Sequence, residues 1–78
     1  MNYLMPEYTS NIQKRAAQVA DSLLSDGYRL MHETDLEDFH YMYLRHQSNG
    51  NRMNIMYRND IIYLQKNGHV VKIIYAKV

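Results

Sequence analysis

Residues 39–76, FHYMYLRHQSNGNRMNIMYRNDIIYLQKNGHVVKIIYA, contain four short runs rich in Tyr, Ile, Val and Met. Three dipeptides separate these runs: Asn49-Gly50, Asn59-Asp60 and Asn67-Gly68. Such pairs favour two-residue β-hairpin loops, because a type I′ turn needs positive φ at both central residues. The stretch therefore predicts four antiparallel strands joined by three tight turns.

Three two-residue loops also predict which residues lie opposite one another. The predicted cross-strand pairs are Lys66–His69, Leu64–Val71, Ile62–Ile73, Tyr57–Ile62, Ile55–Leu64, His46–Met53, Leu44–Ile55 and Met42–Tyr57. They bring together one largely apolar face, made of Met42, Leu44, Met53, Ile55, Tyr57, Ile62, Leu64, Val71, Ile73 and Tyr75. A slip of one residue at any turn would divide this set between two faces. The agreement of three separate turns therefore supports the predicted sheet.

The segment before this stretch predicts one helix, from about Ser10 to Asp26. Ser10 and Gln13 match a capping box, and Gly27 stands where a left-handed residue would end the helix. Apolar residues recur at helical spacing, namely at Ile12, Ala16, Val19, Ala20, Leu23 and Leu24. The helix is thus expected to be amphipathic and to cover one face of the sheet.

A fifth strand is predicted at about residues 28–33, followed by a five-residue loop at 34–38. This loop length puts Tyr28 and Leu30 on the apolar face, whereas a four-residue loop would exchange the two faces. The opposite face then receives Arg29, Met31 and Glu33.

The predicted fold class is α+β, with one N-terminal amphipathic helix packed on one face of a four- to five-stranded antiparallel β-meander. The expected elements are a helix at about 10–26 and strands at about 28–33, 39–47, 52–58, 61–66 and 69–76. The 78 residues are expected to form a single small domain.

Charge is distributed unevenly along the chain. Residues 1–38 contain three basic and seven acidic residues, whereas residues 39–78 contain six basic residues and one acidic residue. The net charge of +1 therefore divides into −4 and +5, and such segregation produces a local field. The chain has no cysteine, which fits a reducing compartment. It also has no stretch typical of a signal peptide or a membrane span, so a cytoplasmic protein without membrane contact is expected.

The second face of the predicted sheet carries tyrosines beside arginines. Its candidate partner-binding residues are Phe39, Tyr41, Tyr43, Arg45, Arg52, Met56, Arg58, Ile61, Tyr63, Lys72 and Ile74. A solvated face would be supported by cross-strand tyrosine–arginine pairs, but it would not need this much apolar surface. Interface cores favour Tyr, Phe, Met and Arg, which indicates a protein partner or a homodimer. Tyrosines beside arginines can also stack bases and neutralise phosphates, which indicates a single-stranded nucleic acid.

Chemistry-bearing patterns are weak in this sequence. His32, His40 and His46 are expected on the apolar side of the sheet, with His32 opposite His40. Two imidazoles could bind zinc if Glu33 or Asp38 added a third ligand, but no close-spaced motif supports this, and no metal site or cofactor is expected. The acidic loop from Glu33 to Asp38 is expected to be a solvated turn.

A catalytic site is likewise not expected. The chain has no nucleophile elbow, phosphate-binding glycine loop or Cys/His pair. Each serine has a structural explanation or no expected base nearby: Ser10, Ser22, Ser25 and Ser48. The sequence therefore predicts a non-catalytic protein–protein interaction module without a small-molecule substrate, such as a small regulator or inhibitor. A single-stranded nucleic-acid-binding module that uses the same face is the alternative.

Overall fold

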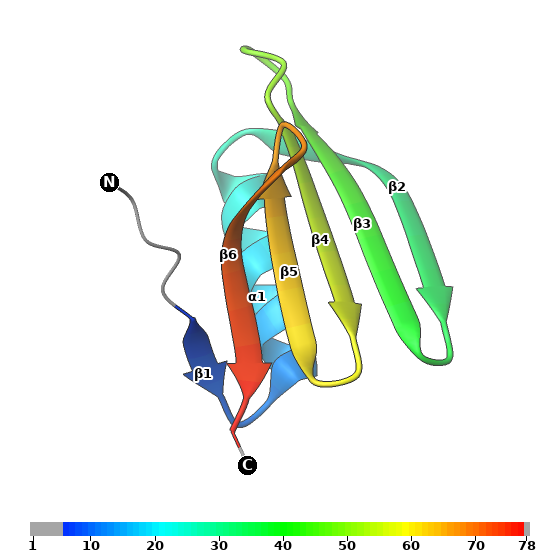
Figure 1. Cartoon of the computed structure of the whole chain (residues 1–78). Helices are drawn as coiled ribbons and strands as arrows, with labels where there is room; N and C mark the ends of the chain where they lie inside the picture. The colour runs from blue at the N-terminus through cyan, green and yellow to red at the C-terminus, as the bar shows by residue number, and fades with distance from the viewer. Residues whose placement is uncertain (1–5, 78) are drawn as a thin grey trace.

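The computed structural model describes residues 6–77, in which one helix packs on a six-stranded sheet (Figure 1). The elements are β1 Glu7–Thr9, α1 Ile12–Ser25, β2 Tyr28–Leu36, β3 Phe39–His46, β4 Arg52–Arg58, β5 Ile61–Lys66 and β6 His69–Ala76. The strand order is β1-β6-β5-β4-β3-β2, so β2 to β6 form an antiparallel meander. The α+β class is confirmed. The strand prediction needs correction, because the sheet has six strands and is mixed.

The additional strand is β1, which pairs in parallel with β6 at the edge of the sheet (Figure 1). Glu7 lies opposite Ile74, and the backbone N–H of Lys77 donates to the carbonyl of Thr9 at 2.7 Å. A three-residue strand has too few positions to show the alternation that predicts longer strands. The sequence pattern therefore did not indicate β1.

Helix α1 begins at Ile12 rather than at Ser10, because Asn11 is the N-cap residue. The Asn11 side-chain oxygen accepts the backbone N–H of Lys14 at 3.0 Å, which satisfies one of the unpaired amides of the first turn. Gly27 has a φ of +99° and ends the helix as predicted. Within residues 6–77, no helix is long and apolar enough to cross a membrane.

Strand β2 is longer than predicted and continues to Leu36. A two-residue turn, Glu37-Asp38, replaces the expected five-residue loop, and Leu36 lies opposite Phe39. The expected end at Glu33 was wrong because acidic residues are depleted in strands, while pairing with β3 outweighs that preference here. A β-bulge at Met31 then shifts the register between Leu30 and His32.

Of the two turns at Asn49-Gly50 and Asn59-Asp60, only the second has the predicted two-residue loop. Asn59-Asp60 forms a two-residue loop, with the predicted pairs Tyr57–Ile62 and Ile55–Leu64. Asn49-Gly50 instead lies in a four-residue loop, 47–50, and Leu44 lies opposite Met53. This register differs from the predicted one by two residues, so every side chain of β3 and β4 keeps its predicted face.

The third turn is correct, but a β-bulge beyond it inverts the rest of β6. Lys66 lies opposite His69 as predicted, whereas Leu64 lies opposite Lys72 and leaves Val71 as an extra residue. One extra residue exchanges the two faces for all following positions. Ile74 therefore lies opposite Ile62 in the core, and the predicted core positions of Ile73 and Tyr75 are wrong.

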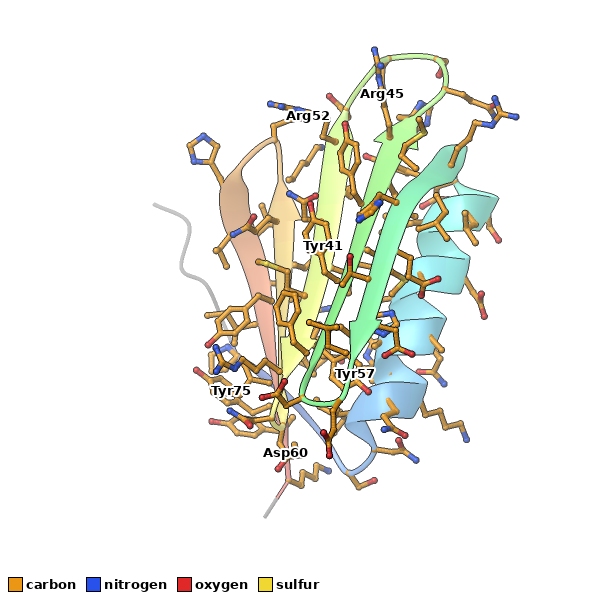
Figure 2. All side chains as sticks on the ribbon, turned by 90° about the vertical axis from the view of Figure 1, so that its right-hand side faces the viewer. Tyr41, Arg45, Arg52, Tyr57, Asp60 and Tyr75 are labelled. Atoms are coloured by element: carbon orange, nitrogen blue, oxygen red, sulfur yellow. The ribbon has the colours of Figure 1, made fainter. Side chains whose placement is uncertain are left out.

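The core lies between α1 and one face of the sheet. It consists of Ile12, Ala16, Val19, Met42, Leu44, Met53, Ile55, Ile62 and Ile74. Figure 2 shows α1 on one side of the sheet, while the side chains of Arg52 and Tyr75 point to the other side. A single helix thus leaves the second face of the sheet uncovered within residues 6–77.

Candidate functional site

The uncovered face of the sheet, here called the open face, is the main candidate surface. Because directly paired residues lie on the same side of a sheet, the observed registers define its members. They are Tyr8, Arg29, His32, Thr34, Leu36, Phe39, Tyr41, Tyr43, Arg45, Arg52, Asn54, Met56, Arg58, Ile61, Tyr63, Gln65, Val70, Ile73 and Tyr75. This set contains five tyrosines, four arginines and no aspartate or glutamate.

Aromatic rings lie along the open face in stacked pairs. The rings of Phe39 and Tyr41 are nearly parallel, with centroids 6.5 Å apart and an interplanar angle of 8°. Tyr8 stacks on Tyr75 with centroids 5.6 Å apart, and Tyr8 is 58% exposed. Such rings present broad apolar surfaces that already have fixed neighbours, which lowers the entropy cost of docking a partner.

Nine of the predicted partner-binding residues lie on the open face, but two do not. The nine are Phe39, Tyr41, Tyr43, Arg45, Arg52, Met56, Arg58, Ile61 and Tyr63. Lys72 and Ile74 lie on the helix side because of the bulge at Val71, and Ile74 is fully buried. Ile73 and Tyr75 occupy the open face in their place. Because Ile73 and Ile74 are adjacent and identical in type, the sequence contains no signal to show which of them faces the helix and which lies on the open face.

Other open-face residues were also missed by the sequence reasoning. Tyr8 belongs to the unpredicted strand β1, and Leu36 belongs to the unpredicted end of β2. Leu36 is 59% exposed, which makes it one of the most exposed large apolar side chains among residues 6–77. Glu33, which was expected on the second face, pairs with Met42 and lies on the helix side. The open face is therefore more apolar and less acidic than predicted.

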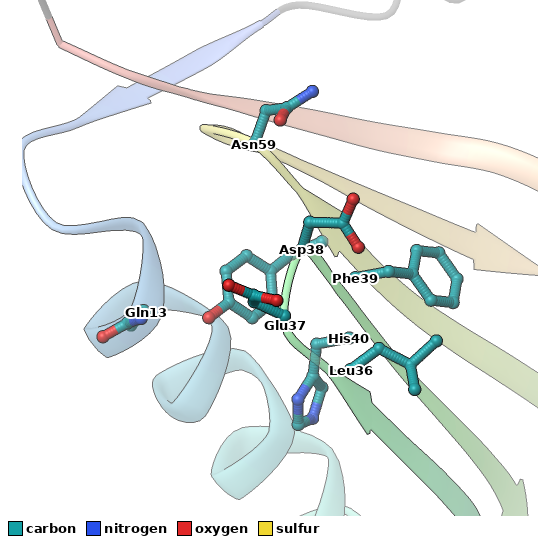
Figure 3. A pocket seen from close by; sticks show the side chains of 8 residues that line it. Gln13, Leu36, Glu37, Asp38, Phe39, His40 and Asn59 are labelled. Atoms are coloured by element: carbon teal, nitrogen blue, oxygen red, sulfur yellow. The ribbon is translucent and has the colours of Figure 1, made fainter.

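A cluster of titratable groups lies on the helix side, where β2 and β3 approach α1. The His40 ring binds Glu33 through Nε2 at 2.8 Å and Asp35 through Nδ1 at 3.1 Å. A groove of about 440 Å³ runs beside this cluster, between β2 and α1. Figure 3 shows the neighbouring pocket of about 280 Å³, in which His40 and Glu37 point toward α1.

The histidines do not form the zinc arrangement considered from the sequence. His32 lies on the open face opposite Tyr43, and its Nε2 contacts the Thr34 hydroxyl at 3.0 Å. His40 lies on the other face, opposite Asp35. Among residues 6–77, no group of three or more His, Asp or Glu side chains is arranged to hold a metal ion. The predicted pairing of His32 with His40 was wrong, because the two-residue turn Glu37-Asp38 places Tyr43 opposite His32 and Asp35 opposite His40.

His46 forms a contact with Ser48 that the sequence did not predict. The Ser48 hydroxyl lies 3.0 Å from His46 Nδ1, and the backbone N–H groups of Ser48 and Asn49 also point at this atom. The other ring nitrogen, Nε2, lies 2.9 Å from the carbonyl of Asp26. Since Nδ1 already accepts backbone amides, the ring orders the 47–50 loop and is poorly placed to act as a base for Ser48.

One ion-pair cluster joins β1 to the rest of the fold. Glu7 binds Arg15 of α1 and Lys72 of β6, each at 2.6 Å. Hydrogen bonds from Arg15 and then Lys72 to the carboxylate lower the pKa of Glu7 from 4.5 to about 2. Both cations are thus used within the chain, and the cluster is structural.

Comparisons with protein-family models, with curated proteins and with solved structures gave no significant match to this chain.

Proposed function

We propose that this chain is a non-catalytic interaction module that docks a partner protein through the open face. One observation carries the proposal: a face with stacked aromatic rings, exposed apolar side chains and four arginines has no element covering it within residues 6–77. Interface cores are enriched in these residue types and depleted in acidic ones. We keep a cytoplasmic location as part of the proposal, since a cysteine-free chain fits a reducing compartment.

The expected partner is a different protein with an acidic surface, rather than a second copy docked face to face. In a face-to-face dimer, the four arginines of each copy would find no carboxylate on the open face of the other copy, because this face carries none. Like charges brought together at an interface cost free energy. A homodimer, which the size of the domain favours, would therefore have to use another surface. Sedimentation at two salt concentrations tests this. Salt screens the repulsion between the arginines of the two copies, so a face-to-face dimer would become stronger at the higher salt concentration.

Docking is tested by a double substitution on the open face with a matched control on the helix. Tyr43→Ala with Tyr63→Ala removes two half-buried rings from adjacent parts of the face. Gln18→Ala with Ser22→Ala changes two exposed residues of α1. The proposal expects that a protein captured by the native chain is lost with the tyrosine variant and retained with the helix variant. Equal capture by both variants would remove the open face as the docking surface.

A single-stranded nucleic-acid-binding module is the second candidate. The observation that favours it is the nearness of tyrosines to arginines, as in the hollow of about 230 Å³ lined by Tyr41, Tyr43, Arg52, Asn54 and Gly68. Bases stack on such rings while basic side chains meet phosphates. Titration with labelled oligonucleotides at two salt concentrations separates the two candidates, because phosphate contacts produce a steep salt dependence. Absence of binding at low salt would eliminate the nucleic-acid candidate.

A further inference from the structure

Three arginines form a row across one end of the open face. Arg29 of β2 lies opposite Arg45 of β3, and Arg45 lies opposite Arg52 of β4. Because neighbouring strands lie about 4.8 Å apart, the row spans about 10 Å. Figure 2 shows Arg45 and Arg52 at the same end of the sheet, next to the 47–50 loop. Like charges directly opposite each other in a sheet are destabilising, so this row carries a cost in the free protein.

No carboxylate offsets this cost within residues 6–77. The ion pairs there use the bases Arg15, Lys72 and His40, and none includes a member of the row. All three arginines are exposed. The row therefore presents three guanidinium groups that remain available to an anion from outside the chain.

Neutral hydrogen-bond donors lie in the adjacent row of the same face. Tyr43 lies opposite Asn54, one position further along β3 and β4 on this face. The Asn54 side-chain oxygen accepts the hydroxyl of Tyr41 at 3.1 Å, and the NH2 group of the same amide can donate two hydrogen bonds. Two hollows adjoin the row: one of about 490 Å³ beside Arg29 and Arg45, and the hollow of about 230 Å³ beside Arg52. An anion seated at the row would thus meet charged and neutral donors together.

We propose that the arginine row is a binding site for a phosphate monoester carried by the docked partner protein. The inference rests on the proposed docking function, since it assigns the chemistry that the partner presents at one end of the open face. A phosphate monoester carries about two negative charges and three acceptor oxygens. Guanidinium groups bind such oxygens in paired hydrogen bonds. This anion matches three adjacent guanidinium groups better than one carboxylate does.

The distribution of charge favours a single phosphate group over a nucleic-acid strand. The fourth arginine of the open face, Arg58, lies six residues from Arg52 along β4, which is about 20 Å. Apolar and neutral side chains, Met56 and Asn54, lie between them on this face. Proteins that bind single-stranded nucleic acids instead have basic groups along a whole groove, which follows the nucleic-acid backbone. The positive charge here is concentrated at one end.

The site is tested by titration followed by amide NMR shifts. The probes are inorganic phosphate, acetate, a Gly/Ser peptide with one central phosphoserine and its unphosphorylated twin. Arg45→Gln removes the centre of the row, and Arg58→Gln removes the same charge from the other end of the face. We expect the dissociation constants of the phosphopeptide for the native chain and for Arg58→Gln to agree within a factor of two. We expect binding to Arg45→Gln to be at least tenfold weaker, and binding of the unphosphorylated twin and of acetate to be tenfold weaker or undetectable.

Stability supplies a readout that a merely structural arginine would not give. Arg45→Gln relieves repulsion in the row, so its melting temperature without phosphate should equal or exceed that of the native chain. Phosphate should raise the melting temperature of the native chain and leave that of Arg45→Gln unchanged. A melting temperature for Arg45→Gln several degrees below native, together with no phosphate effect on either chain, would overturn the site.

Three other outcomes would also overturn it. Equal losses in Arg45→Gln and Arg58→Gln would show attraction by net charge alone. Acetate binding as tight as phosphate would remove the phosphate assignment. A thymidine oligonucleotide that binds more tightly than the phosphopeptide at the same salt concentration would indicate that the open face binds nucleic acid instead. The docking function and the phosphate site are tested by different variants. If phosphate does not bind, the expectation that the Tyr43 and Tyr63 substitutions abolish docking still stands and is tested by itself.

Discussion

Lys72 of β6 and Glu7 of β1 form an ion pair across the parallel edge of the sheet, with Nζ and Oε2 2.6 Å apart. Arg15 of α1 binds the other oxygen of the same carboxylate. One side chain therefore joins the first strand, the helix and the last strand. Its contribution to stability depends on its charge, which makes it a pH-sensitive contact.

Glu7→Gln should destabilise the chain by about 1 kcal/mol at neutral pH, because partly exposed ion pairs typically contribute about 0.2–1 kcal/mol each. The pKa of Glu7 is lowered to about 2 by Arg15 and Lys72, so the folded state favours the charged carboxylate. The contribution is complete above pH 4.5 and is lost as the pH falls toward 2. Urea unfolding of both chains across this range measures it. Glu37→Gln, in the β2–β3 turn, is the control, and a difference that persists at pH 2 would contradict the assignment.

The bulge in β6 predicts opposite fates for two neighbouring isoleucines. Ile74 is fully buried opposite Ile62, whereas Ile73 lies on the open face opposite Tyr63. Ile74→Ala should cost about 2–5 kcal/mol because it leaves a cavity in the core. Ile73→Ala should cost about 1 kcal/mol, the range of strand propensity at a half-buried site. Chemical denaturation of the two variants compares them, and the reverse order would place the bulge elsewhere.

Gly27 should tolerate a side chain less well than Gly68, although both have positive φ. A Cβ at Gly27 would lie 2.9 Å from His46 Nε2, while a Cβ at Gly68 would meet nothing within 4 Å. His46 cannot move away freely, because its ring is held by Asp26 and by the 47–50 loop. Gly68→Ala should cost about 1 kcal/mol for the left-handed backbone, and Gly27→Ala about 2–3 kcal/mol. Thermal unfolding measures both, and equal costs would mean that the His46 contact yields without penalty.

The open-face tyrosines should matter less to stability than the tyrosine on the helix side. Tyr57 packs against the core, whereas Tyr43 and Tyr63 lie on the open face. Tyr57→Ala should cost about 3 kcal/mol or more, as truncation of core aromatics does. Tyr43→Ala with Tyr63→Ala should retain a native circular dichroism spectrum and cooperative unfolding. Unfolding of the double variant at 25 °C would show that these rings belong to the core.

The meander could be predicted where local turn chemistry decides it. Asn67 and Gly68 both have positive φ, so the backbone there has the conformation that an Asn-Gly pair favours. Asn59 has a φ of +56°, and its turn also has the predicted register. At Asn49-Gly50 the His46 side chain stabilises a wider loop by accepting backbone amides. That contact depends on a side chain outside the dipeptide.

The two β-bulges could not be predicted from alternation of residue types. In β6, Ile73 and Ile74 are both apolar, so either phase gives the core an isoleucine. The choice is made by tertiary contacts, which include the ion pair between Lys72 and the unpredicted strand β1. This is why the predicted site kept its β3, β4 and β5 residues but lost Lys72 and Ile74.

The parallel pairing of β1 with β6 also bears on when the fold can be completed. Glu7 meets Ile74, a partner 67 positions further along the chain, so this contact is among the most distant in sequence that residues 6–77 make. Closing so long a loop is entropically costly, and contacts of this kind form slowly. During synthesis, β1 and α1 leave the ribosome before β6, so β1 cannot form its parallel pair until β6 has been made. Strand β1 therefore pairs only after β6 has been synthesised. A chain cut before β6 would leave both Glu7 and Arg15 without the sheet edge that aligns them.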